Sequence, residues 1–177
     1  MKEYIIKTKR LGLRNWNASD LLPFTEMCQD KEVMKYFPNL LSEKDTENFI
    51  KRMQVHFKEF GFCYFAVDIL GTNEFIGFTG MLHQNYESPF TPCVDIGWRL
   101  KKSAWNNGFA TEAAIACLDF ASEKLNLKEI YSIASKVNVS SIHIMKKIGM
   151  NYHSDFQHPA LLKNEFLKNC VAYNFTL

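Results

Sequence analysis

One glycine stands where the chain can be expected to bind an anion. Gly108 follows a strand-like segment and precedes a helix-like one. Glycine lets a ligand approach the backbone without interference from a Cβ atom, and the first N–H groups of a helix have no partners inside it. These donors, with the positive end of the helix dipole, favour a phosphate or pyrophosphate. Because the same arrangement also occurs in simple turns, the helix that follows has to support this interpretation.

That helix is predicted over residues 107–125. Its apolar side chains recur at helical spacing on one face, and most of them are small. They are Ala110, Ala113, Ala114, Cys117, Leu118 and Ala121. A helix with so thin a face can lie close to a sheet, which would hold its N-terminus at the end of the preceding strand.

A second helix is predicted over residues 138–149. Asn138 can cap its N-terminus, and Gly149 supplies the left-handed residue at its end. The side chains expected to point inward are those of Ile142, Met145 and Ile148. Ser141 stands at the third position of this helix, where it can contact a ligand or serve as the capping partner of Asn138.

Composition bounds the kind of protein. A chain of 177 residues with 47% hydrophobic and 23% charged residues is typical of one soluble globular domain. The net charge of +2, without a block of like charge, argues against nucleic acid or a membrane as partner. The five cysteines are scattered and form no C-x-x-C pair, so we expect reduced thiols and no metal site. No segment reads as a signal peptide or membrane span, and we expect a cytoplasmic location.

The pattern of elements indicates an α/β (α+β) fold. Strands are predicted over residues 3–16 (broken around 7–10), 62–70, 74–83, 94–100 and 127–135, from residue 150, and at the C-terminus. Helices are predicted over residues 21–28, 42–60, 107–125 and 138–149, with a further turn near 32–36. This alternation predicts a mixed sheet with helices on both faces, in one domain over residues 1–177. A doubly wound nucleotide fold is disfavoured because the glycine-rich turn would follow an early strand.

Six segments resemble one known family. They are W-N-N-G-F-A-T-E-A around Gly108, T-K-R-L-G-L-R-N-W, D-K-E-V-M-K-Y-F-P, D-I-G-W-R-L, N-V-S-S-I-H-I-M-K-K-I-G-M and D-F-Q-H-P-A-L-L. In this order and spacing they are similar to the GNAT N-acetyltransferases, and the first resembles the R/Q-x-x-G-x-G/A loop in the form typical of the RimJ/RimL-like branch. The resemblance implies a mostly antiparallel sheet of about seven strands.

The resemblance also implies the reaction and the cofactor contacts. Acetyl-CoA would be the donor, and a primary amine of a small molecule or a protein N-terminus would attack it directly in a ternary complex. The implied cofactor-binding residues are Trp98, Arg99, Leu100, Asn106, Asn107, Gly108, Phe109, Ala110, Thr111, Asn138 and Ser141. The backbone of residues 106–111 would wrap the pyrophosphate, that of residues 98–100 would pair with the pantetheine arm, and the last two would lie near the thioester.

The sequence departs from the family pattern at three positions. Trp105 replaces the usual Arg or Gln, and Asn106 replaces a glycine. Neither change removes the main-chain amides. Met145 stands where many GNAT enzymes carry a Tyr that protonates the leaving thiolate, which puts the general acid in question.

Asp95, Ser141 and His83 are the candidate catalytic residues. Asp95 can be a base or an anchor for the ammonium group, or simply a structural carboxylate. Alternation places it on one strand face with Arg99, and we expect these two side chains to pair, which would lower the pKa of Asp95. Ser141 can donate to the thiolate or the oxyanion. His83 ends the preceding strand and can equally be a polar strand terminus.

Two further functions stay open. One is a regulatory or interaction module that binds CoA without turnover, and the other is a protein for a different phosphorylated ligand. The acceptor amine cannot be read from the chain, and a homodimer is also left open.

Overall fold

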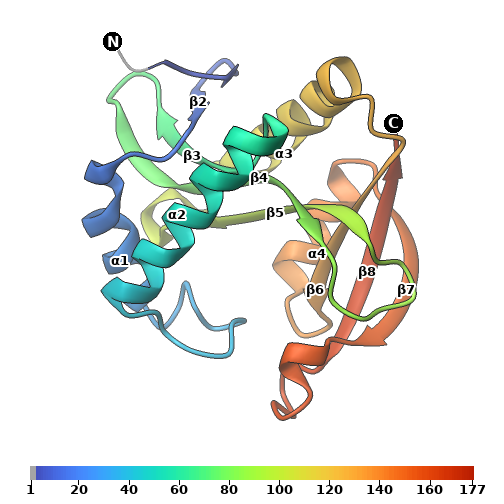
Figure 1. The fold of residues 1–177 in the computed structure, drawn as a ribbon. Coiled ribbons are helices and arrows are strands. Elements are labelled where there is room, and N and C mark those ends of the chain that lie inside the picture. The colour runs from blue at the N-terminus through green and yellow to red at the C-terminus, as the bar shows by residue number, and fades with distance from the viewer. Residues whose placement is uncertain (1–2) are drawn as a thin grey trace.

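The computed structural model describes residues 3–177 and forms one eight-stranded sheet (Figure 1). The strands are β1 Ile6–Lys7, β2 Leu11–Arg14, β3 Tyr64–Ile69, β4 Glu74–Gln84, β5 Cys93–Leu100, β6 Glu129–Ser135, β7 Asn151–Gln157 and β8 Asn169–Thr176. Their order is β1-β2-β3-β4-β5-β6-β8-β7, and β5–β6 is the parallel pair in an otherwise antiparallel sheet. The predicted mixed sheet is confirmed. It has eight strands rather than seven, because the opening segment folds back as a β1–β2 hairpin instead of one broken strand.

Residues 3–177 form four α-helices: α1 Leu21–Gln29, α2 Glu43–Phe60, α3 Phe109–Phe120 and α4 Val139–Lys147. Local signals set their ends. Ser42 and Asp45 form a capping box at the start of α2, and Gly61 ends it with a left-handed φ of 78°. The predicted helix over residues 107–125 is divided, since a π-helical turn over Ala121–Leu125 follows α3.

The helices cover both faces of the sheet, as predicted (Figure 1). On one face Phe49 of α2 stacks on Tyr64 and packs against Phe78. On the other face Phe65 makes an edge contact with Phe120 of α3. Since residues 64 and 65 are neighbours on one strand, they point to opposite faces, and aromatic side chains pack on each face.

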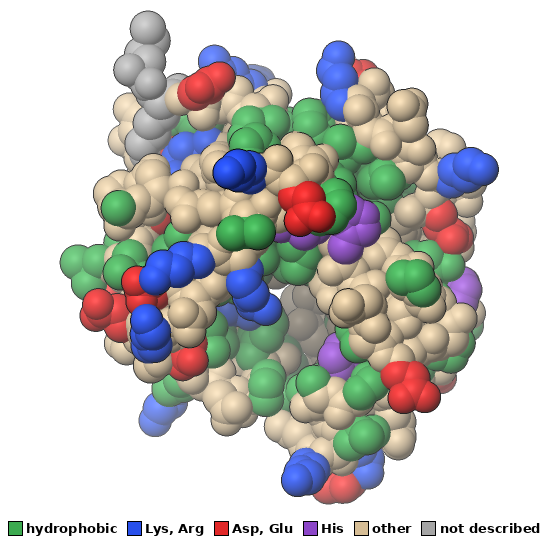
Figure 2. Space-filling model, viewed as in Figure 1, with side chains coloured by type: hydrophobic (Ala, Val, Ile, Leu, Met, Phe, Trp, Pro, Cys, Tyr) green, Lys and Arg blue, Asp and Glu red, His purple; other side chains and the backbone are tan. Residues whose placement is uncertain are grey.

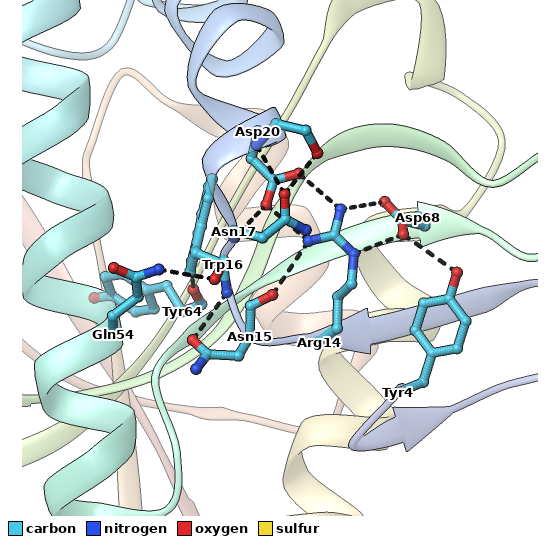
Figure 3. A network of polar contacts seen from close by, with 10 residues as sticks. Tyr4, Arg14, Asn15, Trp16, Asn17, Asp20, Gln54, Tyr64 and Asp68 are labelled. Carbon is cyan, nitrogen blue, oxygen red and sulfur yellow. Dashed lines mark hydrogen bonds and ion pairs between the residues drawn. The ribbon is translucent and has the colours of Figure 1, made fainter. Parts of the chain in front are cut away.

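A buried ion network joins β2, β3 and the entry to α1 (Figure 3). Nε and Nη2 of Arg14 donate to Asp68 at 2.7 and 2.9 Å, and Nη1 and Nη2 each donate to Asp20 at 2.7 Å. Nη1 also donates to the carbonyl of Asn15 at 3.1 Å. Every guanidinium N–H therefore has an acceptor.

Strands β5 and β6 separate soon after they meet. They are in register only at Asp95 and Tyr131, and the Ser132 hydroxyl donates to the carbonyl of Ile96 at 2.9 Å. Since alternate residues of a strand direct their backbone groups to the same side, those of Trp98 and Leu100 face the widening gap. The sheet thus has an internal open edge.

Within residues 3–177, no helix is long and apolar enough to cross a membrane. The same part of the chain holds no group of three or more His, Cys, Asp or Glu side chains arranged for a metal ion. All five cysteines are free thiols, and four of them are buried.

Candidate functional site

A cavity of about 680 Å³ lies at the open edge of β5. The molecule is hollowed in this region, between the side of α1 and α2 and the side of β6–β8 (Figure 2). The lining includes the N-termini of α3 and α4, the end of β5 and residues 32–37 after α1. Ten of the eleven residues expected to bind the cofactor line this cavity: Trp98, Arg99, Leu100, Asn106, Gly108, Phe109, Ala110, Thr111, Asn138 and Ser141.

The N-terminus of α3 presents free donors to the cavity. Gly108 has a left-handed φ of 76°, and no side chain caps the helix there. The backbone N–H of Glu112 donates to the carbonyl of Gly108, so the amides of residues 109–111 precede the first intrahelical bond. Asn106 is also left-handed, with a φ of 61°. This is a concave arrangement of amides suited to an anion.

Trp105 ties the loop to the strand end. Its indole N–H donates to the carbonyl of Leu100 at 2.8 Å, which occupies one of the backbone acceptors expected to face the pantetheine arm. The backbone of Trp98 is left for that pairing. Asn107 donates from its side chain to the carbonyl of Trp105 at 2.9 Å and is the one expected cofactor residue outside the cavity lining.

An ion pair that the sequence did not reveal braces the first turn of α3. Glu112 accepts hydrogen bonds from Thr8 at 2.5 Å and from the Arg10 side chain at 2.7 Å. Burial raises the pKa of Glu112, but these bonds outweigh burial and lower it. The Arg10 guanidinium stacks on Phe109, 4.6 Å from the ring centre. A cation thus lies beside the free amides, from a hairpin about a hundred residues earlier.

The N-terminus of α4 is capped as predicted. The Asn138 side chain accepts the backbone N–H of Ser141 at 3.2 Å, so the capping bond uses the main chain of Ser141. The Ser141 residue lines the cavity, with its hydroxyl not engaged in the cap. Met145 is only 1% exposed and belongs to the core, so no side chain at this position serves as a general acid.

Asp95 has a different partner from the one expected. The Tyr64 hydroxyl donates to Asp95 at 2.6 Å, and Gln84 donates to the same hydroxyl at 3.2 Å. Burial raises the pKa of Asp95 to about 6, although the bonds from Tyr64 and Gln84 act in the opposite direction. The predicted lowering of its pKa by Arg99 is wrong.

Distance and packing explain why the Asp95–Arg99 pair does not form. Four residues of strand separate their Cα atoms by about 13 Å. The ring of Tyr64 fills the space over Gly97 between them, since a Cβ atom on Gly97 would lie 3.3 Å from that ring. Arg99 instead stacks on Phe37, 3.7 Å from the ring centre, and donates to the Cys28 sulfur at 3.3 Å.

His83, like Asp95, lies outside the cavity lining. Its Nδ1 is 3.0 Å from Nε2 of His56, and both rings pack with Phe60 and Phe62. Burial and the neighbouring His56 lower the pKa of His83, while Glu59 opposes them. The geometry fits a structural aromatic cluster better than proton transfer at the cavity.

Tyr64, Gln84 and Tyr86 belong to the surroundings of Asp95, and sequence reasoning missed them. The Tyr86 hydroxyl is buried and has no hydrogen-bond partner among the described residues. Burial, with a contribution from Asp95, raises the pKa of Tyr86. No short motif marks these residues, because strand pairing and the loop after β4 bring them to Asp95.

Comparisons with known proteins agree with this geometry. A family model described as acetyltransferase (GNAT) domain matches residues 10–151. The uncharacterized N-acetyltransferase YnaD of Bacillus subtilis (strain 168) is 31% identical over 153 residues, 86% of this chain and 85% of YnaD. The crystal structure of a GNAT-family acetyltransferase from Bacillus anthracis is 28% identical, covers 97% of each chain and superposes with a TM-score of 0.80.

A more distant structure shares the fold. RimL, a ribosomal L7/L12 alpha-N-protein acetyltransferase in complex with coenzyme A, has a TM-score of 0.80 at 14% identity, over 99% of this chain and 98% of RimL. With the family match over most of the chain and the arrangement of strand, glycine loop and helix, these similarities establish that the chain belongs to the GNAT acetyltransferase family and is an N-acetyltransferase.

Proposed function

We propose that the protein transfers the acetyl group of acetyl-CoA to a primary amine by direct attack in a ternary complex. Acetyl-CoA is the cosubstrate. The observation that carries the proposal is the single cavity into which the N-termini of α3 and α4 and the open edge of β5 all face. An anionic cofactor with an extended arm fits this combination of amides and unpaired strand.

The cofactor would lie across the cavity from α3 to α4. Its pyrophosphate would accept hydrogen bonds from the amides near Gly108, with Arg10 close by. The pantetheine arm would add to the unpaired edge at Trp98, and its thioester would reach Asn138 and Ser141. These placements extend the family resemblance to this chain.

The chemical step needs a proton acceptor and a donor at the leaving sulfur. The amine nitrogen bonds to the acetyl carbon, the carbon–sulfur bond breaks, and the ammonium proton passes to Asp95 through water. With a pKa of about 6, Asp95 is ionised at neutral pH and basic enough to hold that proton. Ser141 donates a hydrogen bond to the thiolate or the oxyanion. His83 has the weaker geometry for this work.

The acceptor would be a small molecule or a protein N-terminus, as in the RimJ/RimL-like branch. RimL itself acts on a protein N-terminus, and its similarity to this chain in fold supports a related use of the cleft. A CoA-binding module without turnover is the alternative. It is favoured by the buried Met145, which supplies no general acid.

Calorimetry with CoA tests the cofactor site. Gly108→Val would place a side chain among the free amides and should remove most of the affinity. Gly61→Val is the matched control, because Gly61 has nearly the same left-handed φ, 78° against 76°, and lies at the end of α2. Both variants bear the strain, and only the first blocks the loop. Equal CoA affinity of a folded Gly108→Val variant and its control would refute the site.

Turnover separates the enzyme from the alternative. A panel of amines with acetyl-CoA, followed by detection of the free thiol, should show release of CoA with at least one acceptor. Binding of CoA without thiol release across protein N-terminal peptides, diamines and amino acids would favour the module without turnover.

A further inference from the structure

Arg99 lies at the wall of the cavity and has no counterion among the described residues. Its side chain is half-buried, and its Nε atom is buried with no hydrogen-bond partner among residues 3–177. Within the described part of the chain, its side chain donates one hydrogen bond, to the sulfur of Cys28. Burial raises the pKa of the Cys28 thiol despite the nearby Arg99, so this sulfur is neutral and supplies no balancing charge.

The guanidinium is nevertheless held in place. It lies 3.7 Å from the ring centre of Phe37 and 5.4 Å from that of Phe78. An arginine stacked in this way keeps the edges of its planar fork available for a carboxylate. Desolvation of a guanidinium without an anion is unfavourable. An anion that binds beside Arg99 offsets this unfavourable energy, which favours its binding.

The position of Arg99 indicates which ligand brings the anion. Arg99 contacts Cys28, which belongs to α1, and Phe37, which follows α1, so it lies on the side of the cavity that α1 and the segment after it form. The amides proposed for the pyrophosphate lie on the other wall, at the start of α3. Asp95, the proposed proton acceptor, is on the same face of β5 as Arg99. The guanidinium therefore faces the region where the acceptor, rather than the phosphates of the cofactor, would lie.

The charge of the lining agrees with this. Lys35, Arg99 and Lys147 line the cavity, against a single carboxylate, Glu32. Such a cavity disfavours a polycationic acceptor near Arg99 and attracts an anionic one.

We propose that the acceptor carries a carboxylate in addition to its amine, and that Arg99 binds this carboxylate as a specificity-determining residue. The proposal rests on the proposed acetyl transfer and names the class of its acceptor. Amino acids, ω-amino acids and acidic peptides belong to this class, and diamines do not.

Matched acceptors test the charge directly. Each ω-amino acid or glutamate-containing peptide is compared with its carboxamide or glutamine counterpart, which keeps the shape and removes the charge. The wild-type protein should favour the carboxylate by about tenfold or more in kcat/KM, as expected for a charge-assisted hydrogen bond. Equal kcat/KM values, or a preference for diamines, would overturn the proposal while leaving acetyl transfer intact.

Three variants assign the preference to its residue. Arg99→Gln should bring the ratio of the two kcat/KM values close to one, and Arg99→Lys should keep part of it. Lys35→Gln removes another cation from the same lining and should retain the ratio. Circular dichroism checks that each variant is folded. If Arg99→Gln weakens CoA binding tenfold and retains the ratio, the anion is a phosphate of the cofactor and the proposal fails.

A binding measurement keeps the test independent of turnover. With CoA present, calorimetry compares an N-acetylated carboxylate with its N-acetylated carboxamide. The carboxylate should bind more tightly to wild type, and this difference should vanish in Arg99→Gln. The absence of any difference in wild type would contradict the proposal even if no acceptor were turned over.

Discussion

Arg14 and Arg99 differ in whether the protein itself supplies carboxylate partners for the guanidinium group. Arg14, 3% exposed, donates all five N–H groups, four of these bonds reaching the carboxylates of Asp20 and Asp68 (Figure 3). Arg99 lines the cavity, stacks on Phe37 and has no carboxylate partner within residues 3–177. The charge of Arg14 is balanced by carboxylates of the same chain, whereas that of Arg99 is left for the proposed carboxylate of a ligand.

The pKa shifts follow the same division. Burial lowers the pKa of Arg14, but the bonds to Asp20 and Asp68 outweigh burial and raise it. Burial also lowers the pKa of Arg99, and the contribution of Cys28 is too small to reverse this. A satisfied buried group stabilises one fold, whereas an unsatisfied group beside a cavity marks a place for substrate.

The largest expected effect separates the two arginines by stability. Arg14→Met removes the guanidinium that binds the buried Asp20 and Asp68 and should lower the free energy of unfolding by about 3–5 kcal/mol. Arg99→Met leaves no carboxylate without a partner, and it should lower the free energy of unfolding by less than about 1 kcal/mol, mostly through lost stacking on Phe37. Urea denaturation measures both. Equal losses would break the comparison.

Asp95 extends the comparison to a carboxylate without a cation. Its pKa is raised to about 6 in the folded state, so the folded protein binds more protons than the unfolded chain between about pH 4 and 6. Stability from this group is therefore present below about pH 4 and is lost as the pH rises through 6. The folded and unfolded pKa values of Asp95 differ by about two, so the free energy of unfolding should fall by about 3 kcal/mol over this range.

Asp95→Asn should remove this loss, because the amide oxygen still accepts the Tyr64 hydroxyl and carries no charge. Urea midpoints of unfolding measure this effect. As the pH rises from 4 to 7, the midpoint of the variant should increase relative to that of wild type. The same variant should lose kcat/KM for the amine above pH 6, with little change in CoA affinity. If the urea midpoints of the two proteins change in parallel with pH, the charge of Asp95 does not destabilise the folded protein. If kcat/KM for the amine is unchanged, Asp95 takes no part in the reaction.

The smallest expected effect concerns the cap of α4. Asn138→Ala removes the acceptor of the Ser141 N–H and should cost about 1 kcal/mol of stability as well as turnover. Ser141→Ala keeps that N–H, so its stability should stay within about 0.5 kcal/mol of wild type while turnover falls. Thermal unfolding and initial rates at saturating acetyl-CoA measure the two effects. A Ser141→Ala variant with full turnover would show that the residue acts only through its backbone.

Features that depend on nearby residues were predictable from the sequence. The capping box of Ser42 and Asp45, the Asn138 cap and the glycine before α3 all act within a few positions, and the structure has each of them. The thin apolar face of α3 was also predictable, since helical spacing alone brings Ala113, Ala114 and Cys117 to the sheet. The family followed from the order of six such segments.

The partners of the functional side chains were decided by the tertiary structure. Tyr64 reaches Asp95 across 31 residues, and Arg10 reaches Glu112 across 102. Strand alternation placed Asp95 and Arg99 on one face, but it does not fix which side chain fills the space between them, and Tyr64 fills it. The charge state of a carboxylate depends on such neighbours and on burial. The sequence by itself determined where the cofactor loop begins, while packing between distant strands and helices determined which charged groups are paired and placed Arg99 at the cavity.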